Sequence, residues 1–344
     1  MDIRRAVPAD AAGMVAVRAT VAPYLVRGVE STRRMLAEPA PGEDAAVFVA
    51  VTTDEPAARA EPAARAEPTA RAEPAARAEA AARDEAARRA PAAGGALVAG
   101  GVLVATASAH RVATSAAGDL GGVAVLVRPD HRGRGIGAEL LSAALDHLRG
   151  LGLRRARAFA QTGSVDFARR HGFEPSREVR FAGLSLRPAP AAPSPPAGVR
   201  LAPLTGWDPA EFFPPYRAAA ADEPGDEPID ALDYAGWRFD VWDEVDLARD
   251  LSVVATVDGA VAAFTLVRRD GARIWSDMTA TVPAYRGRGL AGLVKRAALH
   301  RAAGAGVAMA YTANDEANAP MLAVNRRLGY RRVAAQWSCL ADLR

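Results

Sequence analysis

The sequence predicts an α/β protein with mixed sheets, built as two tandem domains of one fold. Residues 125–152 return as residues 279–306, with ten of the twenty-eight positions identical. Each copy has a short apolar run, a polar turn, a glycine-rich loop and a segment with helical periodicity. The length of 344 residues is that of two domains of ordinary size.

The amino-acid composition excludes several classes of function. Half of the residues are apolar, which is enough for two cores, and the net charge is only +3. Arginine is scattered rather than clustered, so we expect no nucleic-acid partner. The single cysteine, Cys339, excludes an internal disulfide framework and a cysteine-based zinc site. The five histidines show no metal-binding spacing, and we expect no metal.

No targeting or membrane segment is expected. The start of the chain, MDIRRAVPAD, has no apolar stretch typical of a signal peptide. The longest apolar run, residues 96–109, is interrupted by Gly100 and Gly101 and is shorter than the roughly 20 residues of a membrane helix. We therefore expect a cytoplasmic protein without a membrane partner.

The first half is expected to alternate strands and helices. Asp10 is the expected N-cap of the first helix, and alternating valines near residue 49 indicate a buried strand. Gly172 is expected to end the last helix. In chain order, we expect a strand at 2–6, helices at 11–21 and 31–38, strands at 47–51, 96–107 and 121–128, a helix ending near 150, a strand at 154–160, a helix at 164–171, and one or two strands at 173–186.

Two segments of biased composition interrupt this order. From Glu55 the sequence repeats every six residues, as in EPAARA. Regularly spaced proline disfavours helix, and only alanine is left to build a core, so residues 53–93 are expected to form a disordered insertion. A docking or spacer role is the alternative. The proline-rich residues 188–198 predict a stiff linker between domains at 1–187 and 199–344.

The second half repeats the order of the first. Asp208 and Pro209 are the expected N-cap and first residue of a helix. Asp258 and Gly259 form a strong two-residue hairpin signal. In chain order, we expect a strand at 199–204, that helix, hairpin strands at 251–257 and 260–268, a strand at 273–282, a helix at 288–303, a strand at 306–312, a helix at 318–328 and a strand at 330–340.

The glycine loops can be compared with three phosphate-binding sequence patterns, of which only the third is met in full. A Walker loop requires Gly-Lys-Ser/Thr, which both copies lack. A dinucleotide fingerprint matches formally, for example at Gly133, Gly135 and Ala138. It should follow its strand directly, however, and the next strand should end in an acid; neither holds. The third pattern, R-x-x-G-x-G/A, is met by residues 132–137 and 286–291.

On these loops, the chain resembles the GCN5-related N-acetyltransferase (GNAT) superfamily in tandem form, and it is similar to actinobacterial members that include relatives of mycothiol synthase. The resemblance implies two acyl-CoA N-acyltransferase domains with acetyl-CoA as cosubstrate. In that family the loop binds the pyrophosphate through backbone amides. The implied cofactor-binding residues are Val127, Arg132, Gly133, Arg134, Gly135, Ile136 and Gly137 in the first half, and Thr281, Val282, Arg286, Gly287, Arg288, Gly289, Leu290 and Ala291 in the second.

The resemblance extends over residues 312–330 and departs from the family at one point. It places Asn314 or Asn318 near the pantetheine. Many members use a tyrosine four residues before the motif's glycine to protonate the departing thiolate. That position is Asn325 here and Ala168 in the first half. Either Tyr330 or a water replaces it, or the thiolate leaves unprotonated.

A base is also expected, because acetyl transfer requires a neutral amine. Asp277 precedes the second loop on a strand and is the candidate; a purely structural edge carboxylate is the alternative. The equivalent position in the first half is Val123. We therefore expect the chemistry in the second domain and a structural or regulatory first domain.

Residues 222–246 contain ten acids and one base, interleaved with aromatic residues. Such a segment would suit a cationic acceptor; a solvated acidic loop is the alternative.

The leading hypothesis is an N-acetyltransferase acting on the primary amine of a small molecule by direct attack in a ternary complex. An acyl-CoA-binding sensor without transfer activity and an interaction protein working through the repeat tract are the rivals. We expect a monomer or homodimer.

Overall fold

The computed structural model describes residues 1–38, 40–53 and 97–343, so the predicted insertion lies almost wholly outside the described residues. The first half follows the expected order, and residues 173–186 contain one long strand. Its elements are β1 (Asp2–Arg5), α1 (Ala11–Val21), α2 (Val29–Ala37), β2 (Ala46–Thr52), β3 (Leu97–Val98), β4 (Gly101–Arg111), β5 (Leu120–Val127), α4 (Ile136–Gly150), β6 (Arg155–Gln161), α5 (Val165–Arg170) and β7 (Glu174–Ser185).

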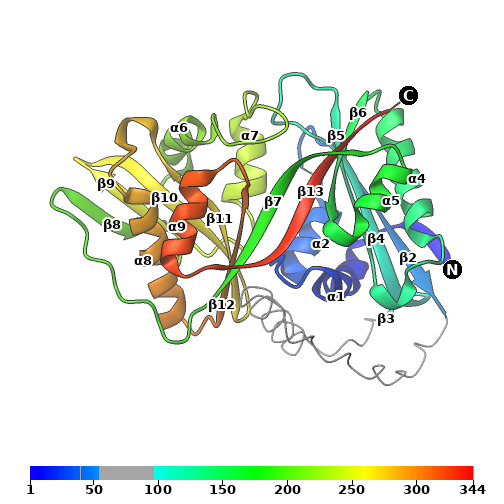
Figure 1. Cartoon of the computed structure of the whole chain (residues 1–344), viewed down its shortest axis with the longest axis horizontal. Helices are drawn as coiled ribbons and strands as arrows, with labels where there is room; N and C mark the ends of the chain where they lie inside the picture. Colours follow the sequence, from blue (N-terminus) through cyan, green and yellow to red (C-terminus); the bar gives the residue numbers. More distant parts are fainter. Residues whose placement is uncertain (39, 54–96, 344) are drawn as a thin grey trace, which may run out of the picture.

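The second half repeats that order (Figure 1). Its elements are β8 (Val199–Pro203), α6 (Pro209–Ala220), α7 (Tyr234–Trp237), β9 (Val253–Val257), β10 (Ala260–Asp270), β11 (Arg273–Thr281), α8 (Leu290–Gly304), β12 (Met309–Asp315), α9 (Ala319–Leu328) and β13 (Arg331–Asp342). Residues 186–198, which include the linker predicted at 188–198, contain neither helix nor strand.

The predicted helix cap and hairpin turn of the second half are confirmed, whereas the predicted cap of the first half makes different side-chain contacts. Asp208 caps α6 by accepting a hydrogen bond from the Ala210 amide at 2.7 Å. Asp258 and Gly259 both adopt positive φ, as the tight turn between β9 and β10 requires. Asp10 occupies the N-cap position of α1, as predicted, but its side chain accepts no hydrogen bond from the amides of that helix. Its carboxylate binds the Arg4 guanidinium and the Val7 amide instead, at 2.7 and 2.8 Å.

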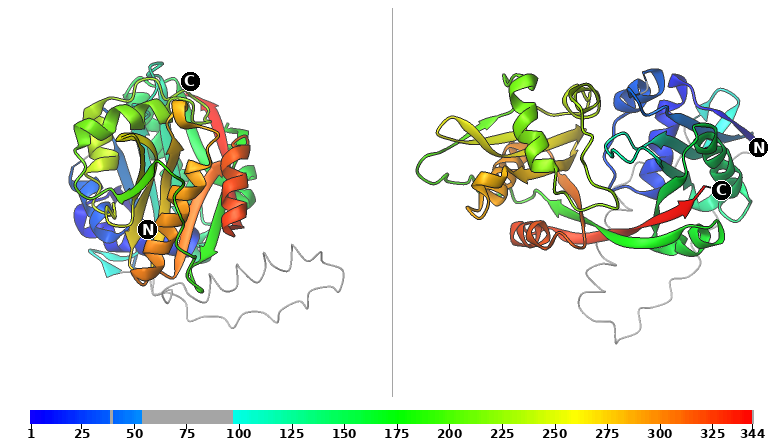
Figure 2. Two further views of the ribbon diagram at one scale, coloured as in Figure 1. Left: turned by 90° about the vertical axis from the view of Figure 1, so that its left-hand side faces the viewer. Right: turned by 90° about the horizontal axis from the view of Figure 1, so that it is seen from above.

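Within the described residues, one mixed sheet of thirteen strands runs through both halves, and the last strand of each half is exchanged. β13, from the end of the chain, pairs with β6 of the first half, whereas β7 pairs with β12 of the second. β7 and β13 pair with each other and cross between the halves (Figures 1 and 2). Cys339 on β13 is fully buried in the core of the first half, and Leu186, next to β7, is buried in that of the second.

Two parallel strand pairs separate part of the way along. β5 and β6 pair from Leu120–Arg155 to Val123–Ala158, and β11 and β12 pair over residues 273–275 and 309–311. Beyond these points the two strands of each pair continue but no longer pair with each other. α4 and α8 pack beneath the two pairs and fill the cores. No helix among the described residues has both the length and the apolar character of a membrane span.

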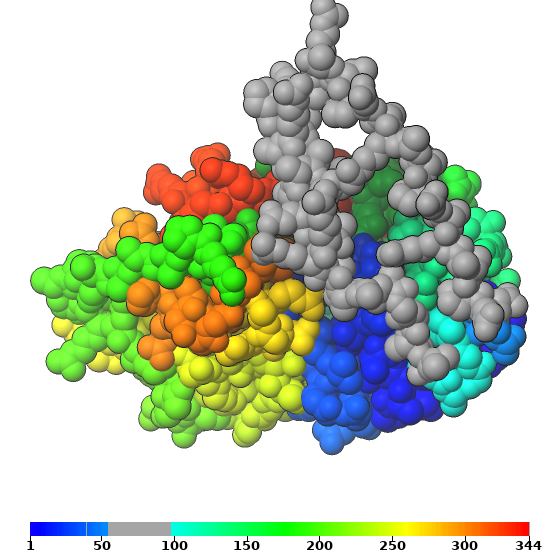
Figure 3. All heavy atoms as spheres, turned by 90° about the horizontal axis from the view of Figure 1, so that it is seen from below, coloured from blue at the N-terminus to red at the C-terminus, as the bar shows by residue number. Residues whose placement is uncertain are grey.

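The acidic stretch at 222–246 fastens the two halves together. Glu227 binds Arg155 at 2.6 Å, and Glu244 binds Arg27 at 3.2 Å. The Asp246 carboxylate accepts from the Gly28 amide at 2.6 Å. The N-terminal helices therefore lie against the second half on the face shown in Figure 3. Trp237 and Trp242 are buried in an aromatic core, so these two aromatic residues are structural. Glu223, Pro224 and Val241 of the same stretch line the central cavity described below.

Candidate active site

The two glycine loops have the same backbone geometry. In the first, the Arg132 Nε donates to the Val127 carbonyl at 3.1 Å; in the second, the Arg286 Nε donates to the Thr281 carbonyl at 3.1 Å. The two glycines of each loop adopt φ between +74° and +83°, where a side chain would be strained. Each loop ends at the start of a fifteen-residue helix, whose first amides have no partner within the helix and face an anion favourably.

The arginines of the loops differ in their surroundings. The Arg286 guanidinium forms an ion pair with both carboxylate oxygens of Asp222, at 2.9 Å for Nη2–Oδ1. This contact lowers the pKa of Asp222. Arg132 makes no ion pair within the described part of the chain. The first loop therefore presents a cation free to meet a phosphate, whereas in the second a carboxylate is already bound there.

A cleft of about 500 Å³ begins at the first loop. It is lined by Arg132, Gly135 and Gly137 and by apolar side chains that include Leu141 and Phe167. The cleft continues between the separated ends of β5 and β6. Residues 286–291 of the second loop line neither this cleft nor the cavity described next.

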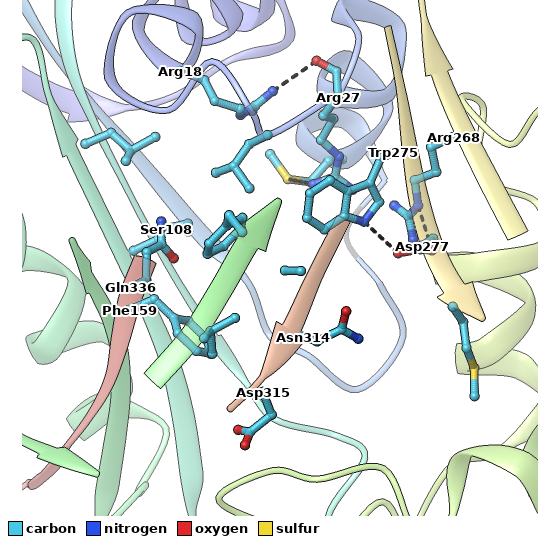
Figure 4. A pocket seen from close by; sticks show the side chains of 18 of the residues that line it. Arg18, Arg27, Ser108, Phe159, Arg268, Trp275, Asp277, Asn314, Asp315 and Gln336 are labelled. Carbon is cyan, nitrogen blue, oxygen red and sulfur yellow. Dashed lines mark hydrogen bonds and ion pairs between the residues drawn. The ribbon is translucent and has the colours of Figure 1, made fainter. Parts of the chain in front are cut away.

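A central cavity of about 710 Å³ lies between the two halves (Figure 4). Helix α1 and strands β4 and β5 contribute from the first half, and α6, β11 and β12 contribute from the second. The cleft and the cavity share the lining residues Val125, Leu126, Phe159 and Gln336. The first glycine loop is therefore connected to a chamber that both halves build.

Asp277, the predicted base, lines this cavity but is held by neighbours. The Arg268 Nε donates to its Oδ2 at 3.0 Å, and the Trp275 Nε1 donates to its Oδ1 at 3.2 Å (Figure 4). Both oxygens are thus engaged by donors, one of them a charged guanidinium. Asp277 supplies a fixed negative charge at the wall of the cavity.

Glu223 is a carboxylate that the sequence analysis did not single out. It follows α6, lines the cavity and forms no ion pair or side-chain hydrogen bond with another described residue. Its side chain is accessible from the cavity, yet the surrounding protein atoms desolvate it. This desolvation raises its pKa, and the charge of Asp277 raises it further. A carboxylate whose pKa is raised is a stronger base and is better suited to accepting a proton from an amine.

The asparagines predicted near the pantetheine also line the central cavity. Asn314 is on β12, and Asn318 caps α9 by accepting from the Met321 amide. Asn325 donates from Nδ2 to the Asn314 Oδ1 at 2.6 Å, and it takes the position of the missing tyrosine. Its own Oδ1 is buried without a hydrogen-bond partner in the described structure. Asn325 itself lines neither the cleft nor the central cavity, so this oxygen is not presented to either of them.

Tyr330, predicted as a possible acid, lines neither cavity. It is 4% exposed, and its hydroxyl lies 3.3 Å from the Ser276 Oγ. Burial raises its pKa well above the usual range. Its position therefore gives no support to a role in protonating a thiolate.

A lysine missed by the sequence analysis lies beneath the second strand pair. Lys295 on α8 is 1% exposed, its Nζ donates to the Thr312 Oγ1 at 3.2 Å, and it lies 5.0 Å from the Tyr330 ring centroid. Burial lowers its pKa to about 7. Its counterpart in the repeat is Leu141, which lines the first cleft. The sequence could have indicated this buried lysine, because the repeat aligns Lys295 with the apolar Leu141.

Metal ligation is not indicated by the described side chains. They contain no group of three or more His, Cys, Asp or Glu residues placed to hold an ion.

Comparisons with known proteins agree with this geometry. The model of the Acetyltransferase (GNAT) family matches twice, over residues 52–173 and 213–330. Mycothiol acetyltransferase of Nocardioides sp. (strain ATCC BAA-499 / JS614) is 31% identical over 224 residues, which cover 60% of this chain and 76% of that protein.

Solved structures show the same tandem fold. A tandem GNAT protein from the clavulanic acid biosynthesis pathway has a TM-score of 0.67 at 19% identity, over 100% of this chain and 98% of that one. A GCN5-related N-acetyltransferase from Sphaerobacter thermophilus has a TM-score of 0.65 at 16% identity, over 100% and 96%. Because the family model covers both halves, this chain belongs to the Acetyltransferase (GNAT) family and carries its domain twice.

Proposed function

We propose that the protein transfers the acetyl group of acetyl-CoA to a primary amine of a small molecule, by direct attack in a ternary complex within the central cavity. The observation that carries the proposal is the connection between the first glycine-loop cleft and a cavity containing Glu223 and Asp277. The cavity volume is in the range of small-molecule sites. The name of the mycothiol acetyltransferase relative also points to a small-molecule acceptor.

The first cleft fits acetyl-CoA. Its loop offers helix amides and the unpaired Arg132 for the pyrophosphate, and apolar walls suit the pantetheine arm. The bound cosubstrate would supply an activated acetyl thioester. The separated ends of β5 and β6 would direct that end toward the shared residue Phe159 and so into the cavity.

The chemistry assigned to the chain is deprotonation and positioning. The amine nitrogen bonds to the thioester carbonyl carbon as the carbon–sulfur bond breaks, and CoA leaves as a thiolate that takes up a proton from water. Glu223 accepts the proton released by the amine, directly or through water. Asp277, fixed by Arg268, keeps the pKa of Glu223 raised. Asp277 itself is the second candidate for the base.

Release of free thiol from acetyl-CoA over a panel of amines tests the proposal. We expect at least one small primary amine to raise the rate above background hydrolysis, with mass spectrometry showing the acetylated amine. Glu223→Gln is expected to lower that rate. If acetyl-CoA binds and no amine in a broad panel is acetylated, the alternative of an acyl-CoA sensor is correct.

A further inference from the structure

We infer that the acceptor carries a carboxylate in addition to its amine, and that Arg18 binds this carboxylate. The inference rests on the proposed function and names the substrate class. It starts from an imbalance among the charges that line the central cavity.

Four arginines and three acids line the cavity, and most of them pair. Arg268 binds Asp277 at 3.0 Å, and Arg177 binds Asp315. Arg27 pairs with Glu244 just outside the lining, at 3.2 Å. Within the described residues, this pairing leaves one cation and one anion without an ionic partner. They are Arg18 and Glu223.

Arg18 is positioned as a binding group. It projects from α1, and its Nη1 donates to the Arg27 carbonyl at 3.1 Å, which fixes the guanidinium (Figure 4). Burial lowers its pKa to about 10, and the nearby charge of Arg27 also lowers it. It remains protonated at neutral pH. A desolvated cation without an anionic partner is unfavourable, and an incoming carboxylate would relieve that cost.

Arg18 and Glu223 come from different halves of the chain, Arg18 from α1 and Glu223 from the segment after α6. Both line the central cavity. The negative charge that acts on Glu223 is that of Asp277. Figure 4 shows Arg18 and Asp277 on different sides of the cavity.

This separation limits the class of acceptor. In an α-amino acid the amine and the carboxylate share one carbon, so that molecule cannot reach both ends. An ω-amino acid with a long chain or a peptide-like molecule can. The geometry therefore points to an extended zwitterionic acceptor, with its amine near Glu223 and its carboxylate at Arg18.

Matched pairs of acceptors test this inference. Each ω-amino acid or dipeptide is compared with the same molecule carrying a neutral carboxamide, with kcat and KM obtained from thiol release with acetyl-CoA. Charge-assisted hydrogen bonds contribute enough for about a tenfold to hundredfold preference in kcat/KM for the acid. The preference should increase with chain length until the molecule spans the cavity.

Arg18→Met should raise KM for the acids by a similar factor and leave the carboxamides unchanged, and Arg18→Lys should restore part of the preference. Arg33→Met, at an exposed arginine of α2, is the matched control. Because Arg18→Met removes the bond to the Arg27 carbonyl, thermal unfolding is measured alongside. Calorimetric titration of the same acceptor pairs reports binding independently of transfer.

The outcomes separate the inference from the proposed function. Equal kcat/KM for acids and carboxamides, or an equal loss for both in Arg18→Met, overturns the inference while acetylation stands. A preference for a dicarboxylic acyl group, such as succinyl-CoA over acetyl-CoA, with no preference among acceptors also overturns it. If no amine is acetylated, the proposed function fails. Arg18-dependent binding of the acids in calorimetry would then still support the carboxylate site, and its absence would remove that too.

Discussion

Arg286 and Asp222 form an ion pair at the glycine loop of the second half, and the equivalent Arg132 of the first half has no such partner among the described residues. The Asp222 carboxylate binds the guanidinium that a pyrophosphate would otherwise meet. Because Arg286 and Asp222 are 43% and 60% exposed, solvent weakens this contact. The pair makes the two halves unequal without closing the second loop completely.

Asp222→Asn is therefore expected to tighten acetyl-CoA binding at the second loop. An exposed ion pair contributes up to about 1 kcal/mol, so the gain should be about fivefold or less. Calorimetric titration measures it, in a Gly135→Glu background that removes the first site. Asp208→Asn, at a helix cap away from the loop, is the control. Unchanged affinity would show that the ion pair does not compete with the cosubstrate.

The same loops allow a matched test of which half supplies acetyl-CoA. Gly135 and Gly289 have φ of +83° and +74°, so a glutamate is similarly strained at either position and adds the same negative charge. Gly135→Glu should abolish high-affinity binding and transfer, because the open cleft begins there. Gly289→Glu should retain most of both. The reverse result would assign the cosubstrate to the second half.

The carboxylates of the cavity predict a pH dependence. Because the pKa of Glu223 is raised, kcat/KM should fall as the pH falls through that pKa and the base becomes protonated. Glu223→Gln should lower kcat by about 10²–10⁴-fold. Asp277→Asn removes a negative charge that raises this pKa, so the acid limb should move to lower pH. All profiles are measured with the same amine, so the titration of that amine affects each variant equally and does not change the comparison between them. A wild-type profile in Glu223→Gln would eliminate this base.

The repeat and the local patterns predicted the elements and both loops, because those features depend on nearby residues. They did not predict which strand completes which half. β7 and β13 have similar strand patterns, and their exchange depends on contacts more than a hundred residues apart in the chain. For the same reason the sequence indicated Asp277 and missed Glu223. Only the tertiary structure shows that Arg268 holds one carboxylate and leaves the other unpaired.

The sequence predicted chemistry in the second half, whereas the proposed function divides the site between the halves. Asp277 and Glu223 come from the second half, and the open cleft belongs to the first. The acidic stretch at 222–246 suggested a cationic acceptor, but five of its ten acids bind arginines or amides of the first half: Asp226, Glu227, Asp230, Glu244 and Asp246. Composition alone could not show whether these acids line a ligand site or bind the two halves to each other.

Lys295 predicts a pH dependence of stability rather than of activity. Its pKa is lowered to about 7 in the folded protein, against an ordinary value of 10.5. The unfolded chain therefore binds more protons between these values, and the lysine's contribution to stability increases as the pH rises through that window. Lys295→Leu, which copies Leu141, should raise Tm most at pH 7 and below. The difference in free energy of unfolding between the two proteins should shrink toward pH 10. A difference that does not vary with pH would show that Lys295 is not desolvated in solution.

The exchanged strands predict that the two halves unfold together. Leu186 lies beside β7 but is buried in the core of the second half, and Cys339 lies on β13 but is fully buried in the core of the first. Leu186→Ala should cost about 2–5 kcal/mol of unfolding free energy, and Cys339→Asp should also destabilise by burying an unpaired charge. Each should shift one common thermal transition, and hydrogen exchange should increase in both halves. Val245→Ala, at a side chain that is 52% exposed, is the control. Two separate transitions, only one of which moves in each variant, would show that the halves fold independently despite the exchange.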